Sequence, residues 1–193
     1  AYMQVLVITG GESSWLAAKG WVFGLALATI VALVVIGGIR SIARVTSVLV
    51  PFMALLYIGS AVIVIALSAE HIPAALSSVV AGAFNPDAAA GGALGAAVIG
   101  FQRALFSNEA GLGSASIAHS AVQTEEPASE GITALLEPFI DTIIILSLSS
   151  LVILTSAIPN NLMNGELAGI ELTSAAFEVH FSAAPFVIAV AAL

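Results

Sequence analysis

A cluster of polar residues and glycines interrupts an apolar stretch in the middle of the chain. The segment 91–110 begins as a Gly- and Ala-rich run of the kind found in membrane helices and then turns polar. Its polar members, with the two glycines that follow, are Gln102, Arg103, Ser107, Asn108, Glu109, Gly111 and Gly113. Lipid contact does not require these side chains. Because non-helical backbone at membrane depth is tolerated only where it is buried in protein or lines a cavity, the pattern predicts a discontinuous helix at a transport site.

Arg103 is the only basic residue within a predicted span, and an ionisable side chain at that depth needs a partner. We predict an ion pair of Arg103 with Asp141 or Glu109, near a cytoplasmic gate. A static ion pair that fixes helix register is an equally good interpretation. The candidates for the inner gate and vestibule are Gln102, Arg103, Ser107, Asn108, Glu109 and Asp141. For the segment 107–111, local chemistry alone slightly favours a capped turn at a helix end.

The composition indicates an integral membrane protein. Of the 193 residues, 60% are hydrophobic and 8% are charged, whereas a soluble domain carries about 25% charged residues. Several apolar runs reach the roughly 20 residues that a helix needs to cross the hydrocarbon core. The alternating polar pattern of an outer-membrane barrel is missing from these runs. We therefore predict an all-α polytopic membrane protein.

The composition also excludes several kinds of function. There are no cysteines, which excludes disulfides, thiolate metal sites and cysteine nucleophiles in this chain. A net charge of −8 with only four basic residues leaves no basic face for nucleic acid. The predicted spans contain no His or Lys and no metal-ligand spacing, so an intramembrane enzyme is the weaker hypothesis. We expect no enzyme activity and no cofactor.

Five apolar segments are predicted to span the membrane, the last of them truncated. Their approximate bounds are 20–39, 46–69, 91–110, 131–158 and 183–193. Arg40 and Arg44 follow the first segment, and by the positive-inside rule this loop is cytoplasmic, so the second and fourth spans run from inside to outside. The segment 72–84 is too short to cross and is predicted to lie on the outer face. Because the chain starts without Met and stops within an apolar run, we expect residues 1–193 to be a single membrane domain, a fragment of a longer protein.

Residues 100–115, which read GFQRALFSNEAGLGSA, closely resemble the signature of the alanine or glycine:cation symporters, the sodium:alanine symporter family. The segments 38–44 (GIRSIAR) and 138–142 (PFIDT) are similar to the same family, in the expected order and distance. The resemblance covers at least residues 37–157, and some fifteen ordered positions with two further segments are far more specific than a lone glycine motif.

The resemblance implies a LeuT-type fold, in which two inverted five-helix repeats each begin with a helix broken at the substrate. The chain would contain about core helices 4 to 7 with pieces of 3 and 8, and the segment 91–110 would be the sixth helix. The implied activity is sodium-coupled symport of a small neutral amino acid, alanine or glycine, across the cytoplasmic membrane by alternating access. The usual sodium site lies on the first broken helix and core helix eight, so we expect the sodium ligands mostly outside this fragment.

On this resemblance, Ile99, Gly100 and Phe101 are the candidate substrate-binding residues. The helix would unwind at Ile99–Gly100, where free amides and carbonyls meet the charged ends of the amino acid, and Phe101 and Phe106 would wall a small pocket. The alternative is close helix packing at Gly100, since glycine is common in membrane helices.

The implied partners are the small neutral amino acid, sodium as the coupling ion, and the lipid bilayer around a multi-pass protein. A channel or a non-transporting membrane subunit is the alternative function. The choice between alanine and glycine, between sodium and proton coupling, and the oligomeric state stay open at this point.

Overall fold

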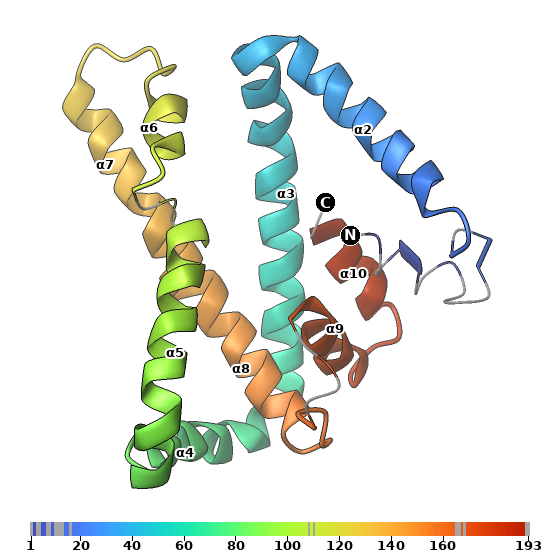
Figure 1. Cartoon of the computed structure of the whole chain (residues 1–193), viewed down its shortest axis with the longest axis vertical. Helices are drawn as coiled ribbons and strands as arrows, with labels where there is room; N and C mark the ends of the chain where they lie inside the picture. The colour runs from blue at the N-terminus through green and yellow to red at the C-terminus, as the bar shows by residue number, and fades with distance from the viewer. Residues whose placement is uncertain are drawn as a thin grey trace. The chain divides into compact units, whose positions relative to one another are not determined.

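The computed structural model describes residues 2, 5–6, 9, 14–15, 17–107, 109, 111–164, 167 and 169–191. Every regular element in this described part is helical (Figure 1). The chain divides into two compact units, one of Ala1–Ala69 with Val152–Leu193 and one of Glu70–Leu151.

The first unit begins with a hairpin of two apolar helices, α2 (Gly20–Ile36) and α3 (Gly38–Leu67), joined at Gly37 (Figure 1). The chain reverses there because Gly38 has a φ of +70°, in the left-handed region that glycine adopts without strain. The predicted loop around Arg40 and Arg44 is therefore wrong. Both arginines lie in the first two turns of α3, which starts at Gly38.

Pro51 lies inside α3. Its ring removes one backbone hydrogen bond from the helix. Membrane helices tolerate this loss where neighbouring groups satisfy the freed carbonyl.

The packed core of the first unit lies where α9 (Ile170–Glu178) and α10 (Ala184–Ala191) meet α3 and the end of α8 (Leu146–Ala157). Phe177 of α9 is fully buried, and its ring lies 5.8 Å from that of Tyr57 and 6.1 Å from that of Phe181 between ring centroids. These aromatic contacts attach the segment after α8 to α3.

His180, between α9 and α10, binds the ends of two helices. Its Nε2 atom lies 2.8 Å from Ser68 Oγ, at the end of α3, and 3.2 Å from Ser156 Oγ, in the last turn of α8. Both serines are buried. The C-terminal ends of α3 and α8 are thus held together at one end of this unit.

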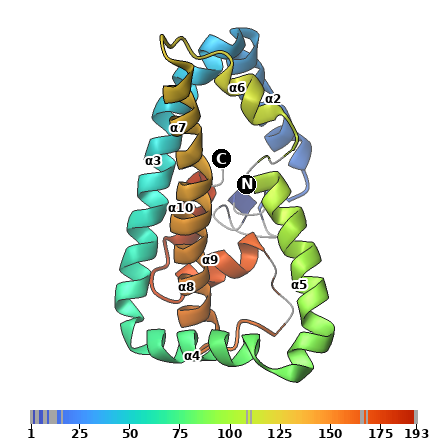
Figure 2. The same cartoon turned by 90° about the vertical axis from the view of Figure 1, so that its left-hand side faces the viewer.

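The second unit contains α4 (Ile72–Ala83), α5 (Pro86–Ser107), α6 (Ser114–His119), α7 (Pro127–Pro138), the π-helix η3 (Phe139–Ile145) and the first turns of α8. The short 3₁₀-helix η2 (Ala69–His71) leads into α4. In Figure 2, α4 lies across one end of α5, to which it is joined by Phe84 and Asn85.

The helices have the surface of a membrane protein. Two helical stretches, Gly38–Leu67 and Pro127–Ala157, are long and apolar enough to cross a bilayer, and Gly20–Ile36 and Leu94–Ser107 are shorter apolar helices. Large apolar side chains on them are exposed, such as Ile36 at 83% and Leu94 at 76%. An apolar surface this extensive is unstable in water but stable against lipid or further protein.

Candidate functional site

Helix α5 runs without a break from Pro86 to Ser107, through all three predicted substrate-binding residues, Ile99, Gly100 and Phe101. The predicted unwound point at Gly100 is therefore wrong. A glycine costs a helix only about 0.5–1 kcal/mol relative to alanine, whereas unwinding at membrane depth frees several backbone groups that each cost more. Among the described residues, no close helix contact is seen at Gly100, since a Cβ placed there would meet no atom within 4 Å.

The helix ends instead at Ser107, which agrees with the helix end predicted for the segment 107–111. Beyond it the chain passes through Glu109, Gly111 and Gly113, whose φ angles of 51°, 79° and 83° are all left-handed, before α6 starts at Ser114. Glu109 Oε2 accepts a hydrogen bond from Ser114 Oγ at 2.5 Å. The predicted vestibule residue Asn108 lies outside the described residues.

An open cavity of about 1000 Å³ lies beside the second half of α5. Its lining residues are Gly100, Gln102, Arg103, Ala104, Phe106, Ser107, Thr142 and Leu146. The cavity thus brings Gly100 together with three of the predicted gate residues. Ile99 and Phe101 are exposed and do not line it.

Sequence reasoning missed three of the lining residues. Thr142 and Leu146 come from η3 and the start of α8, and Ala104 is one turn after Gly100 on α5. Thr142 was within reach of sequence reasoning, because it follows Asp141 in the family-like segment 138–142. Ala104 and Leu146 carry no signal that separates them from ordinary apolar helix residues.

Asp141 binds Ser107, not Arg103. Ser107 Oγ donates a hydrogen bond to Asp141 Oδ2, and this bond links the end of α5 to η3. The predicted pairing of Arg103 with Asp141 or Glu109 is therefore wrong. Ser107 lies one helical turn after Arg103 on the same face, and Asp141 meets that later turn.

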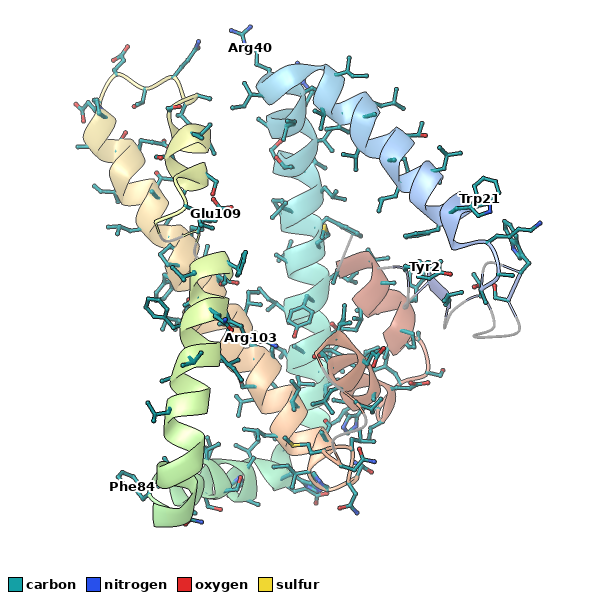
Figure 3. The ribbon with its side chains drawn as sticks, viewed as in Figure 1. Tyr2, Trp21, Arg40, Phe84, Arg103 and Glu109 are labelled. Atoms are coloured by element: carbon teal, nitrogen blue, oxygen red, sulfur yellow. The ribbon has the colours of Figure 1, made fainter. Side chains whose placement is uncertain are left out.

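Arg103 projects from the side of α5, and Glu109 lies beyond the end of that helix (Figure 3). Within the described ranges, each recorded ion pair contains a histidine, and none contains Arg103 or Asp141. Arg103 instead is one of the residues that line the cavity.

The π-helix η3 gives Asp141 its position. The helix from Pro127 to Ala157 changes at Phe139, directly after Pro138, to a wider turn, and Leu146 N–H donates to the Asp141 carbonyl, five residues back. Proline lacks an N–H and disturbs the regular ladder of an α-helix, which accounts for a change at this point. Single π-helical turns are rare and frequently occur at functional sites.

A second polar cluster connects α6 to α7. His119 Nδ1 lies 2.6 Å from Glu130 Oε1, and His119 Nε2 lies 3.8 Å from Glu137 Oε2. The hydrogen bond that His119 donates to Glu130 is the largest cause of a raised pKa for His119; desolvation opposes it, and the charges of both glutamates also raise the pKa. The imidazolium form is thus favoured here.

Comparison with known proteins gives a family match over nearly the whole chain. Residues 2–193 match the model of the sodium:alanine symporter family. The chain is 42% identical over 153 residues to an uncharacterized transporter of Haemophilus influenzae, covering 77% of this chain and 33% of that protein.

Two further relatives carry more specific names. The chain is 36% identical over 156 residues to the sodium/alanine symporter AgcS of Methanococcus maripaludis, covering 80% of this chain and 34% of that protein. It is 37% identical over 158 residues to the probable sodium/glutamine symporter GlnT of Bacillus subtilis, covering 81% and 32%. The chain spans about a third of the length of these curated relatives.

Proposed function

Because this chain belongs to the sodium:alanine symporter family, we propose that it forms part of a protein that carries alanine or glycine together with sodium across the cytoplasmic membrane by alternating access. The family consists of transporters, which points away from an enzyme. Two relatives are named as sodium symporters, one for alanine and one, as probable, for glutamine.

The observation that carries this proposal is the cavity between α5 and η3. Residues that carry the family resemblance, Gly100, Gln102, Arg103 and Ser107, line it together with Thr142. The last four carbonyls of α5 have no donor within the helix and form the negative end of its dipole, which attracts an ammonium group. The Arg103 guanidinium offers an opposite charge on the same cavity.

The substrate would lie beside Gly100, where the missing side chain leaves room, with Phe106 as one wall. The other two substrate-binding candidates, Ile99 and Phe101, are exposed and do not line this cavity, so their proposed contact with the substrate would need the rest of the full-length protein. The proposed inner gate and vestibule consists of the same candidates as before: Gln102, Arg103, Ser107, Asn108, Glu109 and Asp141.

Uptake by the full-length protein in proteoliposomes tests the proposal. We expect concentrative alanine uptake when sodium is outside, and loss of uptake when choline replaces sodium. Liposomes without protein serve as the control. Uptake that persists in choline, or an ion flux that needs no amino acid, would contradict sodium-coupled symport, and the second result would favour a channel.

A further inference from the structure

We propose that Asp141 and Ser107 supply two oxygen ligands for sodium at the junction of α5 and η3. This inference rests on the transport function proposed above. It assigns part of the ion-binding site to residues of this chain, whereas the family resemblance places the usual sodium ligands on helices that lie mostly outside it.

The first argument is charge. Asp141 is the fifteenth of the 31 residues of the apolar helical stretch Pro127–Ala157, and it is half-buried. A carboxylate at membrane depth is costly without compensation. Among the described residues, no Lys, Arg or His forms an ion pair with it, and its recorded partner is the neutral Ser107 hydroxyl. A mobile cation supplies the missing positive charge.

The second argument is ligand chemistry. Hard cations are bound by oxygen, from carboxylates, hydroxyls and backbone carbonyls. Asp141 offers a carboxylate and Ser107 a hydroxyl, and the two are already in hydrogen-bond contact. Ser107 is also the last residue of α5, so the terminal carbonyls of that helix lie within one turn of it. The negative end of the α5 dipole favours a cation at the same point.

The third argument is access and coupling. Ser107 and Thr142, the residue that follows Asp141, both line the cavity beside Gly100. An ion at Asp141 would therefore share a cavity with the amino acid. Binding of either one then changes the affinity for the other by the same factor, which is the thermodynamic requirement for coupled transport.

Sodium-dependent thermal stability of the purified full-length protein tests this inference without transport. Tm is measured without amino acid in sodium chloride and in choline chloride at equal ionic strength, because a ligand of the native state raises Tm in a saturable manner. We expect Asp141→Asn to raise the half-saturating sodium concentration about tenfold or more, and Ser107→Ala to raise it by less. Glu137→Gln is the matched control, because it removes a charge one turn earlier on the same helical stretch. It should leave the half-saturating sodium concentration unchanged.

Several results would overturn the inference. An unchanged half-saturating sodium concentration in Asp141→Asn would do so. An equal loss of Tm in sodium and in choline would also do so, because it would indicate that Asp141 binds a structural partner elsewhere in the protein. If Asp141→Asn does not fold, unchanged half-saturation in both Asp141→Glu and Ser107→Ala overturns it. In each case sodium-driven alanine uptake by the wild type leaves the proposed function standing. Wild-type uptake driven by protons without sodium would reject both.

Discussion

The imidazole of His119 makes the protein's local stability depend on pH. Its pKa is raised above the ordinary value of 6.5, chiefly by the hydrogen bond with Glu130. Because the folded state binds the proton more tightly than the unfolded chain, the contact between His119 and Glu130 contributes its full stabilising free energy below pH 6.5. This contribution is lost as the pH rises through the raised pKa. The attachment of α6 to α7 should therefore be tightest in mild acid.

We predict that an NMR titration of His119 in the full-length protein gives a pKa above 6.5, and that Glu130→Gln lowers it. The reason is that the amide cannot supply the negative charge that favours the imidazolium form. Glu125→Gln, in the same loop but without a recorded contact to His119, is the control and should change the pKa little. A wild-type pKa at or below 6.5 would show that the contact between His119 and Glu130 does not form in solution.

Phe177 is the residue whose removal should cost the first unit the most stability. Its side chain is fully buried, at 0% exposure, between Tyr57 and Phe181. Truncating such a residue leaves a cavity and costs about 3–5 kcal/mol. We expect Phe177→Ala to lower Tm in detergent clearly, and Phe186→Ala, which removes a ring that is 59% exposed on α10, to lower it much less. Equal effects would mean that the rest of the protein covers Phe186.

At the scale of elements, α5 shows what hydropathy and glycine content can and cannot predict. The apolar run predicts a helix, and its polar end predicts that this helix lines a cavity. Several residues of the segment that resembles the family do line the cavity. Gly100 carries no information about a break, because a glycine inside a helix is only weakly unfavourable. The choice of Ser107 over Arg103 as the partner of Asp141 depends on the rotation of one helix against another, which a linear pattern does not specify.

Substitution of Gly100 should separate stability from transport. A Cβ at Gly100 meets no described atom within 4 Å, and the residue lies inside α5, so Gly100→Ala should keep or slightly raise Tm. The added methyl enters the cavity where we place the substrate, so alanine uptake should fall through a higher KM. Gly113→Ala is the opposite case, because a φ of 83° makes any side chain unfavourable there and Tm should fall by about the equivalent of 1 kcal/mol. Unchanged uptake in Gly100→Ala would remove Gly100 from the substrate site.

At the scale of the whole molecule, we predict the direction of the helices in the membrane from two independent observations. Arg40 and Arg44 lie in the first turns of α3, and positive charge near a span marks its cytoplasmic end. His180 binds both Ser68 and Ser156, so the ends of α3 and α8 lie on one side. The predicted apolar segments 20–39 and 46–69 fall on α2 and α3, but their crossing of the membrane stays a prediction.

Labelling from one side of the membrane tests this arrangement. The substitutions Ala43→Cys, at an exposed site near the start of α3, and Met163→Cys, exposed after α8, are made in the full-length protein with any native cysteines replaced. We expect an impermeant maleimide to label Met163→Cys in intact cells and Ala43→Cys only after permeabilisation. The parent protein without cysteines is the control, and labelling of both sites from the same side would contradict the topology. The expectation is strict because α3, with 30 residues, is about 45 Å long and exceeds the roughly 30 Å hydrocarbon core. If a helix of that length crosses the membrane, the ends of α3 and α8, which His180 joins, would lie on the face opposite Arg40 and Arg44.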